Sequence, residues 1–291
     1  MEMSKRELQN INAFLAKVES YEYNLHTFHI EASWFIETAA ECNFALSNFL
    51  SKCPVFPSLK HLKIVGFTGL DAVSVAMLVN CTTGIETISI VECFDQLVPF
   101  SRFCETIVRG SKLASLRFLS LEGNLLCPTI LWALARLIPQ CPHLSVIRLH
   151  NARDCDPRTA PAVGTVNDFM CVAAMQQGMC LSIGRLPFNP IMFFRDCNTV
   201  ESFSRGFLQL SIVECQFDFT GLDAGNAYRR TVNQLFRVSL QRNKLKLDGL
   251  TAAMQTFLGN FDHIYIEGET SLTYDEKAAF CSTPARSITF N

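Results

Sequence analysis

The five residues SIVEC occur twice in the chain, at Ser89–Cys93 and at Ser211–Cys215. Apolar residues precede the cysteine at the same offsets in both copies, which read "IETISIVECFD" and "FLQLSIVECQFD". The copies lie 122 residues apart (211 − 89), which is four steps of about 30 residues. Self-similarity at such a spacing indicates a repeated structural unit rather than a chance match.

A nine-residue frame, L-x-x-L-x-L-x-x-(N/C), describes both copies and fits other places when further apolar residues are allowed at the L positions. Its first positions fall at Leu25, Leu59, Ile85, Leu116, Leu144, Gly178 (a weak match), Phe207, Leu235, Phe261 and Ala285 (a partial match). The mean spacing is about 29 residues. Positions four and six point to one side of an extended strand, and positions three, five and seven to the other. The frame therefore predicts about ten short strands, each with one buried face.

The ninth frame position is occupied by a residue suited to the turn that leaves each strand. It holds Cys93, Asn124, Cys215 and Asn243 in four frames, whereas others place Phe67, Ala152, Leu186 or Glu269 there. A buried Asn or Cys can bond to the backbone groups of such a turn, which need partners. We expect an interrupted ladder of these residues along the sheet.

Helical segments separate the predicted strands. "LLCPTILWALARLIP" follows Asn124 with apolar residues at three-to-four spacing and Pro128 near its start. Residues 70–80, 165–178 and 247–260 show a similar pattern. One strand and one helix per unit predict an α/β fold with a parallel inner sheet and outer helices. The last seven residues, "ARSITFN", have the composition of a final strand.

Two segments, "LRFLSLEGNLLCPTILWALARLIPQCPHL" (116–144) and "LFRVSLQRNKLKLDGLTAAMQTFLGNFDHI" (235–264), resemble leucine-rich-repeat proteins of the ribonuclease-inhibitor-like type. The resemblance implies a horseshoe-shaped solenoid whose parallel strands line a concave surface. Residues 23–291 would form this domain of about ten repeats. "CPHL" and "CPVFPSL" also resemble the repeats of F-box-type ubiquitin-ligase receptors.

Residues 1–22 are expected to form an amphipathic helix that caps the first repeat. Ser4-Lys5-Arg6-Glu7 has the pattern of a capping box, and Leu8, Ile11, Leu15 and Val18 form one apolar stripe. Within the array, residues 151–165 have turn composition and form the longest predicted linker. We interpret this linker as an irregular insertion, with a ligand-contacting loop as the alternative.

Composition favours an intracellular protein, cytoplasmic or nuclear. The 13 cysteines include no CxxC pair, which argues against a disulfide framework or a metal site. No signal peptide is recognisable, and no apolar run approaches the about 18 residues of a membrane span. The chain has 25 basic and 27 acidic residues, so its net charge does not favour binding to nucleic acid or to a membrane surface.

No catalytic constellation or cofactor motif is recognisable in the sequence. His26 and His29 are three apart, so an extended strand directs them to opposite faces. A glycine-rich phosphate-binding loop is absent. We therefore expect neither enzymatic activity nor a bound cofactor or metal.

Frame positions three, five and seven supply the candidate binding surface. Position five holds serine in five frames, which suits a crowded inner surface. Aromatic and arginine side chains, enriched at protein interfaces, occur in the same rows. The predicted protein-binding residues are Lys63, Phe118, Glu122, Arg148, His150, Arg237, Gln241, His263 and Tyr265.

The sequence thus predicts a non-catalytic interaction protein that binds another protein on its concave face. Charges of both signs alternate, which favours a protein partner over a polyanion. One alternative is a substrate-recognition subunit of a ubiquitin ligase. A second is a GTPase regulator resembling the leucine-rich GTPase activators of nuclear transport, although "STPARSITFN" supplies no acidic tail of the kind expected there. The sequence does not define the oligomeric state.

Overall fold

The structure is a computed structural model of the whole chain. It describes residues 10–187 except 21–23, 53, 83, 111–112, 154, 157 and 177, and beyond them the strand segments 207–213, 216–218, 235–241, 244–246, 261–267 and 287–290. The chain divides into two compact units. The first comprises residues 1–144 and 151–156, and the second residues 145–150 and 157–291.

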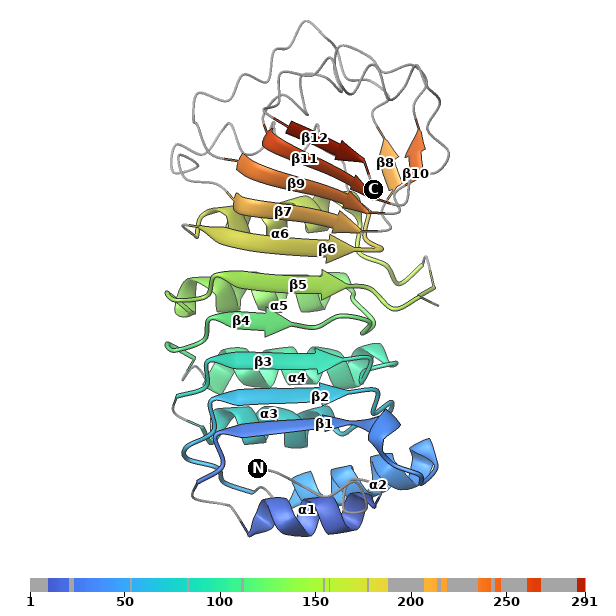
Figure 1. Cartoon of the computed structure of the whole chain (residues 1–291), viewed down its shortest axis with the longest axis vertical. Coiled ribbons are helices and arrows are strands. Elements are labelled where there is room, and N and C mark those ends of the chain that lie inside the picture. Colours follow the sequence, from blue (N-terminus) through green and yellow to red (C-terminus); the bar gives the residue numbers. More distant parts are fainter. Residues whose placement is uncertain are drawn as a thin grey trace, which may run out of the picture. The chain divides into compact units, whose positions relative to one another are not determined.

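The first unit alternates strands and helices. Its elements are α1 (Ile11–Glu19), β1 (Thr27–Glu31), η2 (Ala32–Trp34), α2 (Ala39–Ser51), β2 (His61–Val65), α3 (Ala72–Asn80), β3 (Thr87–Val91), α4 (Leu97–Gly110), β4 (Phe118–Ser120), α5 (Pro128–Leu137) and η3 (Ile138–Gln140). The strands lie in chain order, β1-β2-β3-β4, and each neighbouring pair is parallel. Helices α3, α4 and α5 lie behind one face of the sheet (Figure 1).

The second unit also contains a parallel sheet, with helix α6 between its first two strands. Its elements are β5 (Val146–His150), α6 (Val163–Ala174), β6 (Met179–Gly184), β7 (Phe207–Val213), β9 (Leu235–Gln241), β11 (Phe261–Glu267) and β12 (Ser287–Phe290), with a separate parallel pair of β8 (Gln216–Asp218) and β10 (Lys244–Lys246). The main sheet has the order β5-β6-β7-β9-β11-β12 and is parallel throughout. The final strand predicted from "ARSITFN" is present. The helix predicted at residues 247–260 lies outside the described residues.

The buried face of the strands is the one that the frame predicts. Positions four and six pair across neighbouring strands, as Leu62 with Ile88 and Ile64 with Ile90. These four side chains have no solvent exposure. In β6, Leu181 and Ile183 take the same places and are equally buried. The period-two pattern therefore identifies the core side of strands β1 to β6. Burial of one such aliphatic side chain contributes about 2 kcal/mol to the free energy of folding.

Only the first anchor of the Gly178 frame is displaced, by one residue. Gly178 is exposed and has a φ of 69°, so it forms the turn before β6. Met179 is fully buried in its place, and the pairing of β6 with β7 shifts between Met179 and Cys180. The irregularity lets the longer thioether side chain reach the core. One residue separates Met179 from Leu181 where the frame requires two, so a frame with fixed spacing misplaces this anchor.

Side-chain caps and proline define where the helices of the first unit begin. Thr38 and Glu41 form a capping box: Glu41 Oε2 accepts from the Thr38 N–H at 2.9 Å, and Thr38 Oγ1 accepts from the Glu41 N–H at 3.4 Å. Pro128 opens α5, as predicted. Helix α1 starts after Asn10, whose side chain accepts from the Ala13 N–H at 2.9 Å. The capping box predicted at Ser4 lies outside the described residues.

Aromatic side chains fill the core beside α1. Phe14 of α1 lies 6.3 Å from Phe28 of β1 and 5.9 Å from Phe35, measured between ring centroids. Phe28 in turn stacks on Phe49 and Phe56. Helix α1 therefore packs on the first strand–helix repeat. Its separation as a capping segment, residues 1–22, remains a prediction.

The turns that leave four of the described strands share one geometry. The eighth frame position is left-handed in Gly66, Glu92, Gly123 and Arg185, with φ values of 76°, 53°, 72° and 51°. In three of these turns the N–H donates to the carbonyl at position seven of the next strand, from Gly66 to Val91, from Glu92 to Glu122 and from Arg185 to Val213, each at 2.9 Å. Glycine adopts this conformation without strain, whereas Glu92 and Arg185 must be held in it by such contacts.

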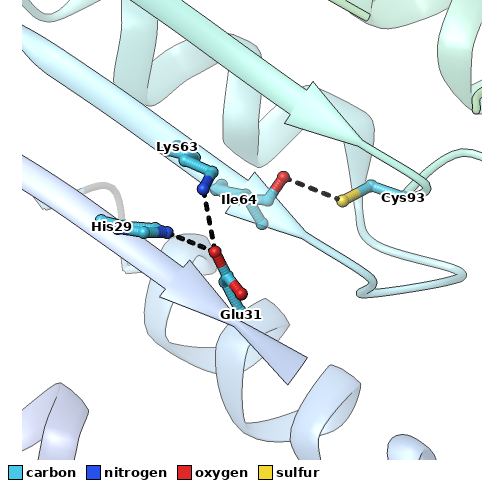
Figure 2. A network of polar contacts seen from close by, with 5 residues as sticks. All are labelled: His29, Glu31, Lys63, Ile64 and Cys93. Atoms are coloured by element: carbon cyan, nitrogen blue, oxygen red, sulfur yellow. Dashed lines mark hydrogen bonds and ion pairs between the residues drawn. The ribbon is translucent and has the colours of Figure 1, made fainter. Parts of the chain in front are cut away.

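Asn124 satisfies the backbone of the preceding turn from inside the core. Its Oδ1 accepts from the N–H groups of Cys93 and Phe94 at 3.0 and 2.9 Å, and its Nδ2 donates to the Ile90 carbonyl at 2.8 Å. Cys93 acts similarly, since its Sγ lies 3.6 Å from the Ile64 carbonyl oxygen (Figure 2). The predicted ladder role is confirmed for these two residues.

Asn151 continues the ladder where the frame had placed Ala152. Its Oδ1 accepts from the N–H groups of Leu126 and Ala152 at 2.9 and 3.0 Å, and it is almost fully buried. Asn124 and Asn151 also form an isolated parallel bridge. The amide therefore occupies the eighth position in this repeat, and alanine at the ninth has no side chain that could replace it. The linker predicted at residues 151–165 ends early, because α6 begins at Val163.

The chain is thus an α/β protein in which a parallel sheet alternates with helices, an arrangement compatible with a repeat solenoid. Within the described part of the chain, no helix is long and apolar enough to cross a membrane.

Candidate interaction face of the sheet

The sheet face is defined here as the side of the strands opposite the buried anchors. In the first unit, position five forms a row in which His29, Lys63, Ser89 and Ser120 lie directly opposite one another. In the second unit the same row is Arg148, Ser182, Ser211, Ser239 and Tyr265. We call these sets row five, and use row three and row seven for the flanking positions. Strand pairing thus aligns the predicted face residues into lateral rows.

The nine predicted binding residues fall into two separate groups. Lys63, Phe118 and Glu122 belong to the first unit and are half-buried. Arg148, which is exposed, and His150, which is half-buried, belong to the second unit. The remaining four are placed by backbone register alone: Arg237 opposite Gln209, His263 opposite Arg237, Gln241 opposite Val213, and Tyr265 opposite Ser239.

Lys63 is engaged in an ion-pair network on the face of the first unit. Its Nζ donates to Glu31 Oε1 at 2.9 Å, and His29 Nε2 lies 2.7 Å from the same oxygen (Figure 2). The hydrogen bond from Lys63 is the main reason that the pKa of Glu31 is lowered. Glu31 is therefore ionised at neutral pH, and a ligand that binds Lys63 must compete with it.

Trp34 is a face residue that sequence reasoning missed. It lies in η2, directly after β1, and its ring packs edge-on against His29 with centroids 4.7 Å apart. Tryptophan in such a place is a frequent interface anchor. The nine-residue frame ends before Trp34, so the frame could not identify it. Its position close to a predicted strand end was the only feature of the sequence that pointed to the face.

Further cross-strand pairs occupy the first unit. His61 Nδ1 lies 3.1 Å from Thr87 Oγ1, directly opposite it in row three. At the starts of β2 and β3, Lys60 Nζ lies 3.1 Å from Glu86 Oε1. The bond from Lys60 is the main cause of the lowered pKa of Glu86. Polar side chains here bond to their neighbours, as is usual for cross-strand pairs.

In the second unit, the His150 side chain of β5 extends over the neighbouring strand β6. Its Nε2 is 2.9 Å from Ser182 Oγ on β6. A Cβ atom on Gly184 would lie only 2.7 Å from His150 Cγ, so glycine leaves the space that the imidazole occupies. Arg148 precedes this histidine by two residues and shares the same face. Ser182 and Gly184 therefore hold one basic side chain in a defined orientation.

Three buried cysteines lack the properties of nucleophiles. Burial raises the pKa of Cys93 to about 12 and that of Cys141 to about 11, and it also raises the pKa of Cys104. These thiols are protonated at neutral pH and behave as small apolar side chains.

The histidines singled out in the sequence do not meet. His26 Nδ1 contacts the Ser58 carbonyl oxygen at 3.0 Å, while His29 contacts Glu31 and Trp34. Among the described residues, no group of three His, Cys, Asp or Glu side chains is arranged to hold a metal ion.

No protein-family model matches the chain, and no curated protein matches it. The geometry of the sheet face therefore carries the functional interpretation.

Proposed function

We propose that the chain is a leucine-rich-repeat interaction protein of the ribonuclease-inhibitor-like type, which binds a protein partner on its sheet face and performs no catalysis. The observation that carries this proposal is the one-sided placement of the helices in the first unit (Figure 1). Parallel sheets are usually covered on both faces. A polar, half-exposed face on such a sheet is therefore available to another molecule.

Strand order supports a repeat solenoid over a doubly wound α/β fold. A doubly wound sheet reverses its strand order at a switch point, where ligands bind, and places helices on both faces. Within each unit the main-sheet strands instead follow chain order. The buried amides of Asn124 and Asn151 at successive strand exits also support stacked repeats, because each bonds to the backbone of the preceding turn.

The side chains on the face favour a protein as the partner. Trp34 and Phe118 supply half-buried aromatic surface, and Lys63 and Glu31 supply both signs of charge. Mixed aromatic and charged surface is typical of protein interfaces. We further propose an intracellular location, cytoplasmic or nuclear, because the cysteines of the described part are all free.

A matched pair of aromatic substitutions tests this function. Phe118 lies on the sheet face, whereas Trp132 lies on α5 and is 54% exposed. Proteins captured from a cell extract by the unaltered chain should be lost with Phe118→Ala and retained with Trp132→Ala. Thermal unfolding of both variants checks that the fold is intact. Equal capture by both variants would show that the sheet face is not the binding surface.

A further inference from the structure

In the middle of the second unit's sheet face, the side chains carry no charge and most of them are small. Strands β6 and β7 place Ser182 opposite Ser211 in row five and Gly184 opposite Val213 in row seven. Row three continues with Cys180 opposite Gln209. Side chains of this size keep the face low, so an extended polypeptide could approach the strands closely.

Basic residues flank this uncharged middle. Arg148 and His150 stand on β5, and His150 is oriented by Ser182 and Gly184. On the far side, Arg237 of β9 and His263 of β11 hold neighbouring register positions in row three. Among the row positions that the structure defines in this unit, Glu267 is the one acidic residue. The rows therefore carry an excess of basic groups.

The spacing of the strands suits a short extended segment. Three strand steps of about 4.8 Å separate β5 from β9, or about 14 Å in all. Four or five residues of extended chain span that distance. Serine hydroxyls between the two basic strands can donate to backbone carbonyls or carboxylates of such a segment.

We propose that the second unit's sheet face binds an extended acidic segment of a protein partner, whose carboxylates pair with Arg148 and His150 while its backbone crosses β6 and β7. This inference rests on the proposed function and specifies its partner. Charge complementarity selects the acidic segment, because the flanking groups are basic and the floor between them carries no charge. A nucleic acid is disfavoured, since the whole chain has a net charge of −2.

The test uses the full chain and a fluorescein-labelled ten-residue peptide of alternating glutamate and serine, with anisotropy as the readout. A peptide in which glutamine replaces glutamate is the control. The glutamate peptide should bind, and its affinity should fall as salt is raised from 50 to about 300 mM. Equal binding of the glutamine peptide would overturn the proposal, as would tighter binding of a ten-nucleotide oligothymidine.

Two substitutions locate the binding on the face. Arg148→Gln should weaken binding of the glutamate peptide about fivefold, whereas Arg136→Gln on the exposed side of α5 should leave it unchanged. Gly184→Ala removes no charge but displaces the His150 ring, so it should weaken binding about threefold. Unchanged affinity in both face variants would overturn the site, and unfolding midpoints confirm that each variant is folded.

Peptide binding and capture of cellular proteins together distinguish failure of this inference from failure of the proposed function on which it rests. If the glutamate peptide fails to bind while Phe118→Ala still abolishes capture of cellular proteins, the face is an interaction surface of different chemistry. If capture is also insensitive to Phe118→Ala, the proposed function fails as well.

Discussion

The two units share a scaffold but differ in the charged residues that occupy the rows of their sheet faces. In the first unit, Lys63 and His29 both bond to Glu31, so the main charged groups are paired within the chain. The same rows of the second unit hold Arg148, His150, Arg237 and His263, with Glu267 as the acidic residue of the described register. The difference teaches that the anchors define the fold, while the charge of the spacer positions can change from one unit to the other without altering it.

The largest expected effect concerns the scaffold. Asn124→Ala would leave the buried N–H groups of Cys93 and Phe94 without partners and should lower the free energy of unfolding by about 3 kcal/mol. Asn48→Ala on the exposed side of α2 is the control and should change it by less than about 0.5 kcal/mol. Urea titration at neutral pH measures both. Similar values for the two variants would contradict the ladder.

A glycine pair tests the strand-exit turn. Gly123→Ala requires an alanine at a φ of 72° and puts its Cβ 2.5 Å from Glu92 Cγ, so a loss of about 2 kcal/mol is expected. Gly69→Ala has a similar φ of 76° but open space around the new methyl, and should cost about 1 kcal/mol. The difference between the two free energies of unfolding isolates the contact with Glu92. No difference would show that this contact is not rigid.

Charge pairing in the first unit should appear as a pH dependence. Because the pKa of Glu31 is lowered in the folded chain, its contribution is present above the ordinary glutamate pKa and is lost as pH falls through the folded value. Lys63→Met should therefore cost up to about 0.5 kcal/mol at pH 7, since the pair is partly exposed, and nothing at about pH 2. Urea unfolding at both pH values checks this. An equal cost at both would mean that Lys63 acts through packing.

The smallest stability effect is expected in the second unit. Arg148→Glu reverses an exposed charge and should change the free energy of unfolding by less than about 0.5 kcal/mol, while it abolishes binding of the acidic peptide. A large loss of stability would assign Arg148 a structural role. The same substitution at Arg136 on α5 provides the reference for a surface charge.

Sequence periodicity predicted the core better than it predicted the contacts. Ile88 and Ile90 follow from alternation alone, because a strand that buries one face must place apolar residues two apart. Asn151 and Met179 each lie two residues from the neighbouring anchor, Leu149 and Leu181, where the fixed frame requires three, so the frame missed both by one residue.

The frame predicted how the face residues align in rows, but it did not predict the contacts between their side chains. Register aligned Arg148 with Ser182 and Arg237 with Gln209, as the frame implied. The diagonal bond from Lys63 to Glu31 depends on side-chain reach, and the place of His150 over Gly184 depends on a missing side chain on the next strand. Neither follows from spacing along a single strand.

The most direct measurement compares Arg148→Gln and Lys63→Gln in the same binding assay with the glutamate peptide. If the second unit alone presents a basic face, the affinity should fall about fivefold for Arg148→Gln and stay within experimental error for Lys63→Gln. An equal or larger loss for Lys63→Gln would contradict the contrast between the two faces.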